Sequence, residues 1–151
     1  PSTLLTIGNS AFTNCASLTE ELVLPQRLEY IGDGAFYNCQ KLWSNNLLVP
    51  SSIKYMGSLV FFQNQYISKI TIPQIACEFH DNAFFGMEHL TEIDLTAYDH
   101  VPVEWQATWK SFNLSGTGKI IINESQNVQS WSDFLEAKGL DLASWTIERR
   151  T

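Results

Sequence analysis

The chain has 151 residues, of which 44% are hydrophobic and 13% aromatic, enough to bury one continuous core without a metal. Its formal net charge of −7 argues against partners that are bound by neutralising phosphates, so neither nucleic acid nor an anionic membrane is expected. No apolar run approaches the roughly 20 residues that a membrane-spanning helix needs, so no membrane insertion by this segment is expected.

The first 96 residues contain an internal repeat, marked by prolines that recur every 23 to 25 residues at Pro1, Pro25, Pro50 and Pro73. Aligned on these prolines, the repeats share a large apolar residue, a glycine, a phenylalanine, and a leucine or isoleucine. These positions hold Ile7, Ile31, Met56 and Phe79; Gly8, Gly32, Gly57 and His80; Phe12, Phe36, Phe61 and Phe84; and Leu18, Leu42, Ile67 and Leu90. A coil of this length cannot bury its own apolar side, so the repeats are expected to stack and share one core.

Each repeat closes with a short alternating segment that predicts a β-strand, at residues 22–24, 47–49, 70–72 and 93–95. Because side chains alternate between the faces of a strand, the middle residue of each segment is expected to point outward. The proline that usually follows cannot continue a hydrogen-bonded ladder. The glycine column is interpreted as a turn with strained dihedral angles, and each Ala-Phe pair as a tight helical turn.

Residues 31–42 show the repeat most clearly, with Ile-Gly and Ala-Phe pairs followed by Cys39 and Leu42. This pattern resembles the BspA-type leucine-rich repeat, and the resemblance extends to residue 95. The third and fourth repeats depart from it at Met56, Val60, Asn64, His80 and Met87. The resemblance implies an α/β solenoid, a right-handed leucine-rich-repeat coil with short parallel β-strands on its concave face and a C-terminal helical cap.

From Ala97 the rhythm changes, which indicates either a separate domain or a cap over the last coil. We favour a cap, with helices predicted at 103–112 and 128–138, a further strand at 119–123 and a final strand at 145–147. Gly139 is the expected end of the second helix. The chain thus divides into four repeats of 23–25 residues over 1–96, the first incomplete at its N-terminus, and a capping segment over 97–151.

The N-terminal end of the stack differs from the capped end. Pro1 holds a position that follows a strand in the other repeats, and Leu4, Ile7 and Phe12 form an apolar edge. Further repeats upstream in the same polypeptide are therefore expected to cover that edge.

Two groups of residues have the composition of a phosphate-binding loop and of a metal or acid–base site, but not the required spacing. The segment 116–119, Gly-Thr-Gly-Lys, suggests a phosphate-binding loop, but Asn113 stands where such a loop needs glycine. His80 with Asp81, His89, and the Asp99-His100 pair are metal-binding or acid–base residue types without ligand spacing. His80 and His89 are expected on the outer side of the same coil. We predict no catalytic residue, cofactor or metal, and no enzymatic activity.

The three cysteines do not indicate a metal or redox site, because they lack close spacing. Cys15 and Cys39 occupy the same position of adjacent coils, where strands roughly 4.8 Å apart make a disulfide geometrically conceivable. The family pattern places small core residues there instead, which favours buried free thiols. Cys77 has no assignable base partner.

The outward side chains of the predicted strands form the candidate binding surface. One row is Val23, Leu48, Thr71, Asp94 and Ile121, and beside it lies the row of Glu21, Asn46, Lys69, Glu92 and Lys119. Both rows are expected to face solvent, and contiguous exposed apolar residues such as Val23 and Leu48 often mark a partner site. Tyr37, Phe62 and Phe85 form either a second candidate stripe or half-buried filler between coils.

The family resemblance implies an extracellular protein, secreted or held at the cell surface, whose solenoid binds host or extracellular proteins or other cells. We therefore predict a non-enzymatic protein-binding module. The alternative is a structural or assembly component of a surface layer, filament or virion. A metal- or carbohydrate-binding module around residues 80–100 is the third and least favoured hypothesis.

Overall fold

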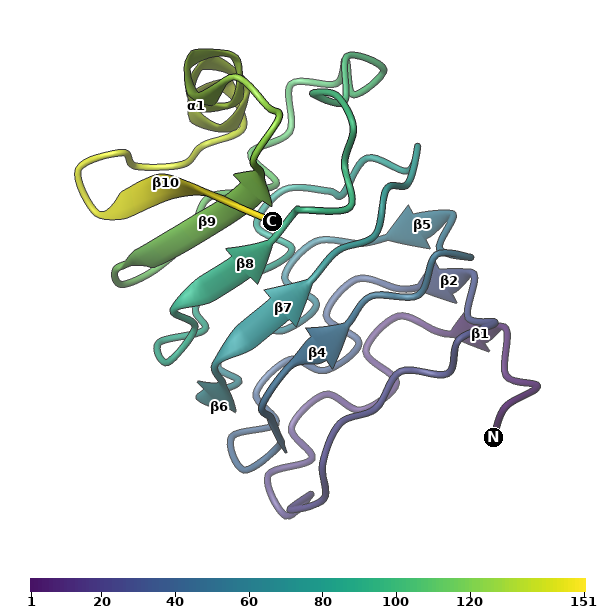
Figure 1. Ribbon diagram of the computed structural model, residues 1–151. Helices are drawn as coiled ribbons and strands as arrows, with labels where there is room; N and C mark the ends of the chain where they lie inside the picture. Colours follow the sequence, from purple (N-terminus) through teal and green to yellow (C-terminus); the bar gives the residue numbers. More distant parts are fainter.

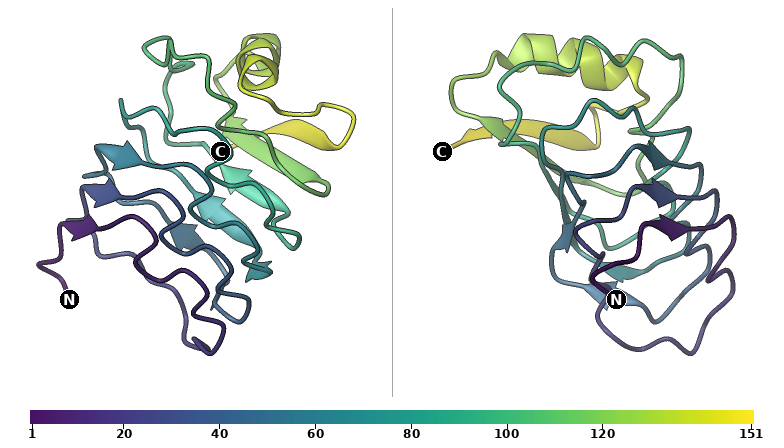
Figure 2. Two further views of the ribbon diagram at one scale, coloured as in Figure 1. Left: turned by 180° about the vertical axis from the view of Figure 1, so that it is seen from behind. Right: turned by 90° about the vertical axis from the view of Figure 1, so that its right-hand side faces the viewer.

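The repeats fold into stacked coils, as the computed structural model of residues 1–151 shows (Figure 1). The N-terminus lies at one end of the stack, and the single α-helix lies at the other (Figure 2). The predicted leucine-rich solenoid with a helical C-terminal end is therefore confirmed. That helix is too short to cross a membrane.

Three parallel sheets run along the stack, because equivalent segments of successive coils lie side by side. The largest has five strands, in the order β10-β9-β8-β7-β4. They are β4 (Leu47–Leu48), β7 (Lys69–Thr71), β8 (Glu92–Asp94), β9 (Gly118–Asn123) and β10 (Trp145–Arg150). Two smaller sheets consist of β1 (Thr6–Ile7), β2 (Tyr30–Ile31) and β5 (Tyr55–Met56), and of β3 (Trp43–Ser44) and β6 (Tyr66–Ile67).

The phenylalanines of the repeat form a continuous column through the core. Ring centroids of Phe12 and Phe36 lie 5.2 Å apart, those of Phe36 and Phe61 5.7 Å, and those of Phe61 and Phe84 6.1 Å. Phe112 continues the column, 6.4 Å from Phe84. Each ring thus packs against the ring of the next coil. A single repeat would leave its ring uncovered, so it needs its neighbours for burial.

Turn strain, which the sequence predicts, is not the reason for glycine at this position of the repeat. None of its three glycines adopts a positive φ, and the left-handed backbone occurs two positions later, at Ser10, Gly34, Leu59 and Asn82. Instead, a Cβ on Gly32 would lie 2.4 Å from the backbone nitrogen of Asn9, and one on Gly57 2.6 Å from that of Asp33. Glycine is therefore required for close approach of adjacent coils.

The helix predicted over 103–112 is wrong, since the segment forms turns. Its backbone groups are bonded to neighbouring elements instead of along a helix: the Ala107 amide donates to Glu78 Oε2 at 3.0 Å, and the Phe112 amide to the Lys138 carbonyl at 2.8 Å. Trp105 and Phe112 are buried. The segment is thus one more coil of the stack, whose contacts with distant residues override the local helical pattern.

The second predicted helix is confirmed as α1 (Val128–Ala137). The Asn127 side chain caps it by accepting a hydrogen bond from the Ser130 amide at 2.9 Å. Trp131 and Leu135 bury its inner face against the last coil. Gly139, at φ +96°, allows the chain to leave the helix and enter β10.

Candidate functional site

The five-stranded sheet presents one side to the core and one away from it. We call the second side the open sheet face. Its register places Leu48, Thr71, Asp94 and Ile121 side by side in one row, and Lys69, Glu92 and Lys119 in the other. Asn46 lies directly before β4, whereas Glu21 and Val23 belong to the first coil.

Ile121 is expected from the sequence to face solvent, but it is 0% exposed, so this prediction is wrong. It is not part of the main core cluster, although its neighbours Ile120 and Ile122 are. Glu148 of β10 lies opposite it in register, and this carboxylate pairs with Lys119 at 3.1 Å. The extra strand β10 and its side chains thus enclose a position that would be exposed at a sheet edge.

Ion pairs occupy the half of the open sheet face formed by β7 to β10. Lys69 Nζ lies 3.0 Å from Glu92 and 3.3 Å from Asp94, and Arg150 lies 3.3 Å from Glu92. Lys119 is paired with Glu148. The three cations on this face are therefore already neutralised within the chain.

The ion pairs shift the protonation equilibria of their members. Burial opposes ionisation of Glu92, but hydrogen bonds and charges from Lys69 and Arg150 outweigh it and lower the pKa. The pKa of Asp94 is also lowered against burial, by hydrogen bonds from Thr96 and then by Lys69. The pKa of Lys69 is raised, chiefly by its hydrogen bond to Glu92. These groups remain charged at neutral pH.

The first coil does not join this sheet as its sequence predicts. Residues 22–24 form no strand, and their contact with the second coil is an isolated bridge between Glu21 and Trp43. The Leu22 amide donates to the Trp43 carbonyl at 2.7 Å. The bond equivalent to that from the Val49 amide to the Thr71 carbonyl, which would run from the Leu24 amide to the Leu48 carbonyl, is not made.

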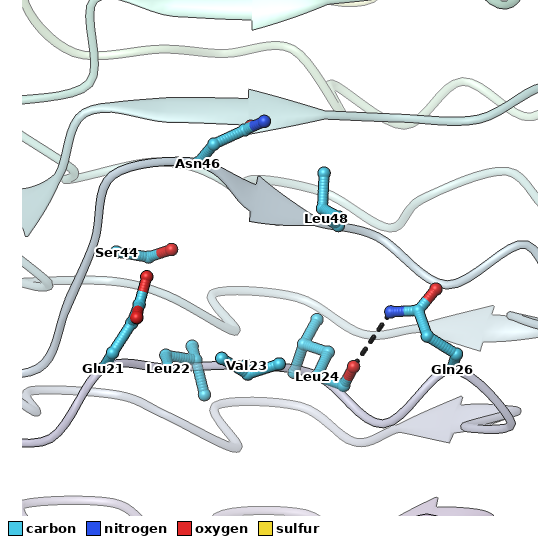
Figure 3. Close-up of a pocket in the computed structure, with 8 residues that line it drawn as sticks. All are labelled: Glu21, Leu22, Val23, Leu24, Gln26, Ser44, Asn46 and Leu48. Carbon is cyan, nitrogen blue, oxygen red and sulfur yellow. Dashed lines mark hydrogen bonds between the residues drawn. The ribbon is translucent and has the colours of Figure 1, made fainter.

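A groove opens between this segment of the first coil and β4 (Figure 3). It has a volume of about 220 Å³, and Glu21, Val23, Gln26, Ser44, Asn46 and Leu48 contribute to its lining. Val23 is 72% exposed and Leu48 50%, so two large apolar side chains stand open to solvent beside it. A second hollow of about 270 Å³ continues past Leu48 and Gln26 toward Thr71. Four of the eight residues that line the groove are hydrophobic, so it is less polar than the ion-paired half of the open sheet face.

Glu21 is the one charged side chain that lines the groove, and it takes part in no ion pair. Gln26 is oriented by its own contact, because its Nε2 donates to the Leu24 carbonyl at 3.0 Å (Figure 3). Asn46 accepts a hydrogen bond from the Thr71 hydroxyl at 2.8 Å. The groove therefore combines fixed amides with a free carboxylate.

The histidines that sequence reasoning singled out do not converge on one site. His80 lies between Tyr55 and Trp109, tilted against the first at 4.5 Å and stacked on the second at 3.8 Å between ring centroids, and His89 stacks on Tyr66 at 5.8 Å. They extend aromatic columns of the coils. No group of three or more His, Cys, Asp or Glu side chains is placed to hold a metal ion.

The remaining sequence candidates have packing roles. Tyr37, Phe62 and Phe85 are half-buried and stack from coil to coil at 5.0 and 5.7 Å. Cys15 and Cys39 are free thiols. Burial raises the pKa of the Cys39 thiol, and burial likewise raises the pKa of Cys77 to about 11, which disfavours the reactive thiolate.

The sequence did not predict the buried ion pair between Lys138 and Glu78. The Lys138 ammonium, 6% exposed, forms an ion pair with Glu78, 60 residues earlier in the chain. It also donates to the Ala107 carbonyl at 2.7 Å. The pair joins the end of α1 to the fourth coil, and nothing in the local pattern around either residue indicates the other.

A family model for the BspA type leucine-rich repeat region matches residues 1–102 in six copies. Comparison with curated proteins and with solved structures found no match. The family match covers well over half of the chain and agrees with the parallel stack of the structure. The chain therefore belongs to the BspA-type leucine-rich repeat family.

Proposed function

We propose that the chain is the adhesive module of a secreted or cell-surface protein, and that it binds proteins on other cells or in the extracellular matrix through the open sheet face. The observation that carries this proposal is the pair of exposed apolar side chains, Val23 and Leu48, beside the groove. Exposed apolar residues that adjoin a hollow are typical of protein-binding surfaces. Repeat proteins of this kind commonly bind partners in this way.

The two halves of the open sheet face support different roles. The half that contains Lys69 and Lys119 satisfies its own charges, so it offers a partner little unpaired chemistry. The groove half leaves apolar area and the Glu21 carboxylate exposed. Binding energy is therefore expected to concentrate around Leu48, with the ion-paired half as a polar rim.

Attachment of cultured epithelial cells to a surface coated with the chain tests the proposal. We expect Leu48→Asp to reduce attachment at least tenfold, because a carboxylate would have to be desolvated in an apolar contact. Val103→Asp is the matched control, since Val103 is 74% exposed but lies outside the sheet. Equal attachment of wild type and Leu48→Asp would rule out adhesion through this face.

Self-assembly is the second candidate function, as in a surface layer or filament. The first coil exposes Leu5 at 44% and Phe12 at 39%, and Phe12 lines a hollow of about 190 Å³. A further coil, either upstream in the same polypeptide or from a second copy, would bury apolar area of this kind. Sedimentation velocity over a hundredfold concentration range distinguishes the two: assembly that Phe12→Asp removes would favour the structural role.

A further inference from the structure

The groove carries unpaired backbone groups as well as apolar side chains. In a parallel ladder, alternate residues of a strand direct their N–H and C=O groups to opposite neighbours. The Val49 amide donates to the Thr71 carbonyl at 3.0 Å, so Val49 and Leu47 face β7, and Leu48 faces the first coil. The N–H and C=O of Leu48 find no partner there.

The same bond is made from the end of β7 to β8 and from the end of β8 to β9. The Ile72 amide donates to Asp94 at 3.0 Å, and the Leu95 amide donates to Ile121 at 2.7 Å. The Leu22 amide of the first coil bonds to Trp43 of β3, but the first coil makes no backbone bond to β4, and the groove lies between the two. The edge of β4 therefore keeps a free donor and a free acceptor that a second strand would satisfy.

Charge complementarity identifies the kind of segment that fits. Glu21 lies at the start of the groove without a cation, and Figure 3 shows its carboxylate on the same side as Ser44. The nearest cation in sequence, Arg27, lies past Pro25 and lines a different hollow. The chain as a whole carries a net charge of −7, which attracts a basic partner over distance.

We propose that the groove binds an extended segment of a partner protein in which a lysine or arginine has an apolar residue two positions away on either side, so that these side chains point to one face. The segment's backbone pairs with the free N–H and C=O of Leu48, and its apolar side chain packs between Val23 and Leu48. Its basic side chain meets the Glu21 carboxylate. This mode of recognition gives affinity through backbone pairing and selectivity through side chains. The inference rests on the proposed function, because it names the partner chemistry of the same face.

Four short peptides with blocked ends serve as probes. Their binding is measured by nitrogen-15 NMR titration of the chain's amides. Three have the sequences Val-Ser-Arg-Ser-Val, Val-Ser-Gln-Ser-Val and Val-Ser-Glu-Ser-Val. The fourth is the arginine peptide with methylated backbone nitrogens, which cannot donate hydrogen bonds. We expect the arginine peptide to shift the Leu24 and Leu48 amides and to bind about two- to fivefold more tightly than the glutamine peptide. Methylation should abolish binding.

Variants assign the selectivity to one carboxylate. Glu21→Gln should remove the preference for arginine, and Glu124→Gln, a control on an exposed loop at the far side of the sheet, should leave it unchanged. Equal binding of the arginine and glutamate peptides, or undiminished binding of the methylated peptide, would overturn the inference. If no peptide shifts the groove while Leu48→Asp still abolishes cell attachment, the inference fails and the proposed function stands. If the arginine peptide shifts the groove amides but Leu48→Asp has no effect on cell attachment, the inference is supported and the proposed adhesive function is ruled out.

Discussion

Replacing Gly57 with alanine tests whether close approach between coils explains the glycine column. The added Cβ would lie 2.6 Å from the backbone nitrogen of Asp33 and 2.9 Å from its Cα. Ordinary van der Waals contact begins at about 3.4 Å, so the backbone of one coil must move. Asp33 resists this movement because its Oδ1 accepts a hydrogen bond from the Ser58 amide at 2.9 Å.

The expected cost follows from that overlap. Forcing a methyl group against backbone in a packed core costs about 1–3 kcal/mol. The Gly57 amide also donates to the Ile31 carbonyl at 2.9 Å, and opening the coils lengthens this bond. We therefore expect Gly57→Ala to lower the free energy of unfolding in urea by about 2–3 kcal/mol.

Gly8 provides a matched control within the same column. A Cβ on Gly8 would meet nothing within 4 Å, and its φ is not positive. We expect Gly8→Ala to change the free energy of unfolding by less than about 0.5 kcal/mol. An equal loss in the two variants would refute the close-approach explanation, because the cost would then arise from backbone conformation common to the column.

Two further predictions concern ion pairs. Lys138→Met leaves the Glu78 carboxylate buried without its cation, so we expect a loss of about 3–5 kcal/mol in urea unfolding; a loss under about 1 kcal/mol would contradict a buried charge there. The lowered pKa values of Glu92 and Asp94 mean that the unfolded chain takes up protons first as the pH falls, so the stability these groups contribute is present above about pH 4.5 and is lost below it. Urea midpoints measured from pH 7 to pH 3 should fall less steeply in Lys69→Met, and an unchanged slope would show that Lys69 is not the cause.

The sequence by itself determined the architecture of the stack. The period of 23 to 25 residues places equivalent residues on top of one another, so the column from Phe12 to Phe84 could be predicted without coordinates. The helix α1 was also predicted, because its apolar stripe and the terminal Gly139 are local signals. Alternation likewise predicted which residues of β7 and β8 face outward.

The candidate site depends on contacts between residues far apart in the sequence, which a local sequence pattern cannot predict. Whether the Leu24 amide bonds to the Leu48 carbonyl is decided by how the first coil packs, and the groove lies where that bond is not made. Ile121 is enclosed because β10 adds a strand beyond it. The segment over 103–112 has helical spacing, but its backbone bonds to Glu78 and Lys138 hold it as a coil. Repetition determines the stack because each coil sees the same neighbours, whereas the ends of the stack have unequal neighbours, so only the tertiary structure decided what forms there.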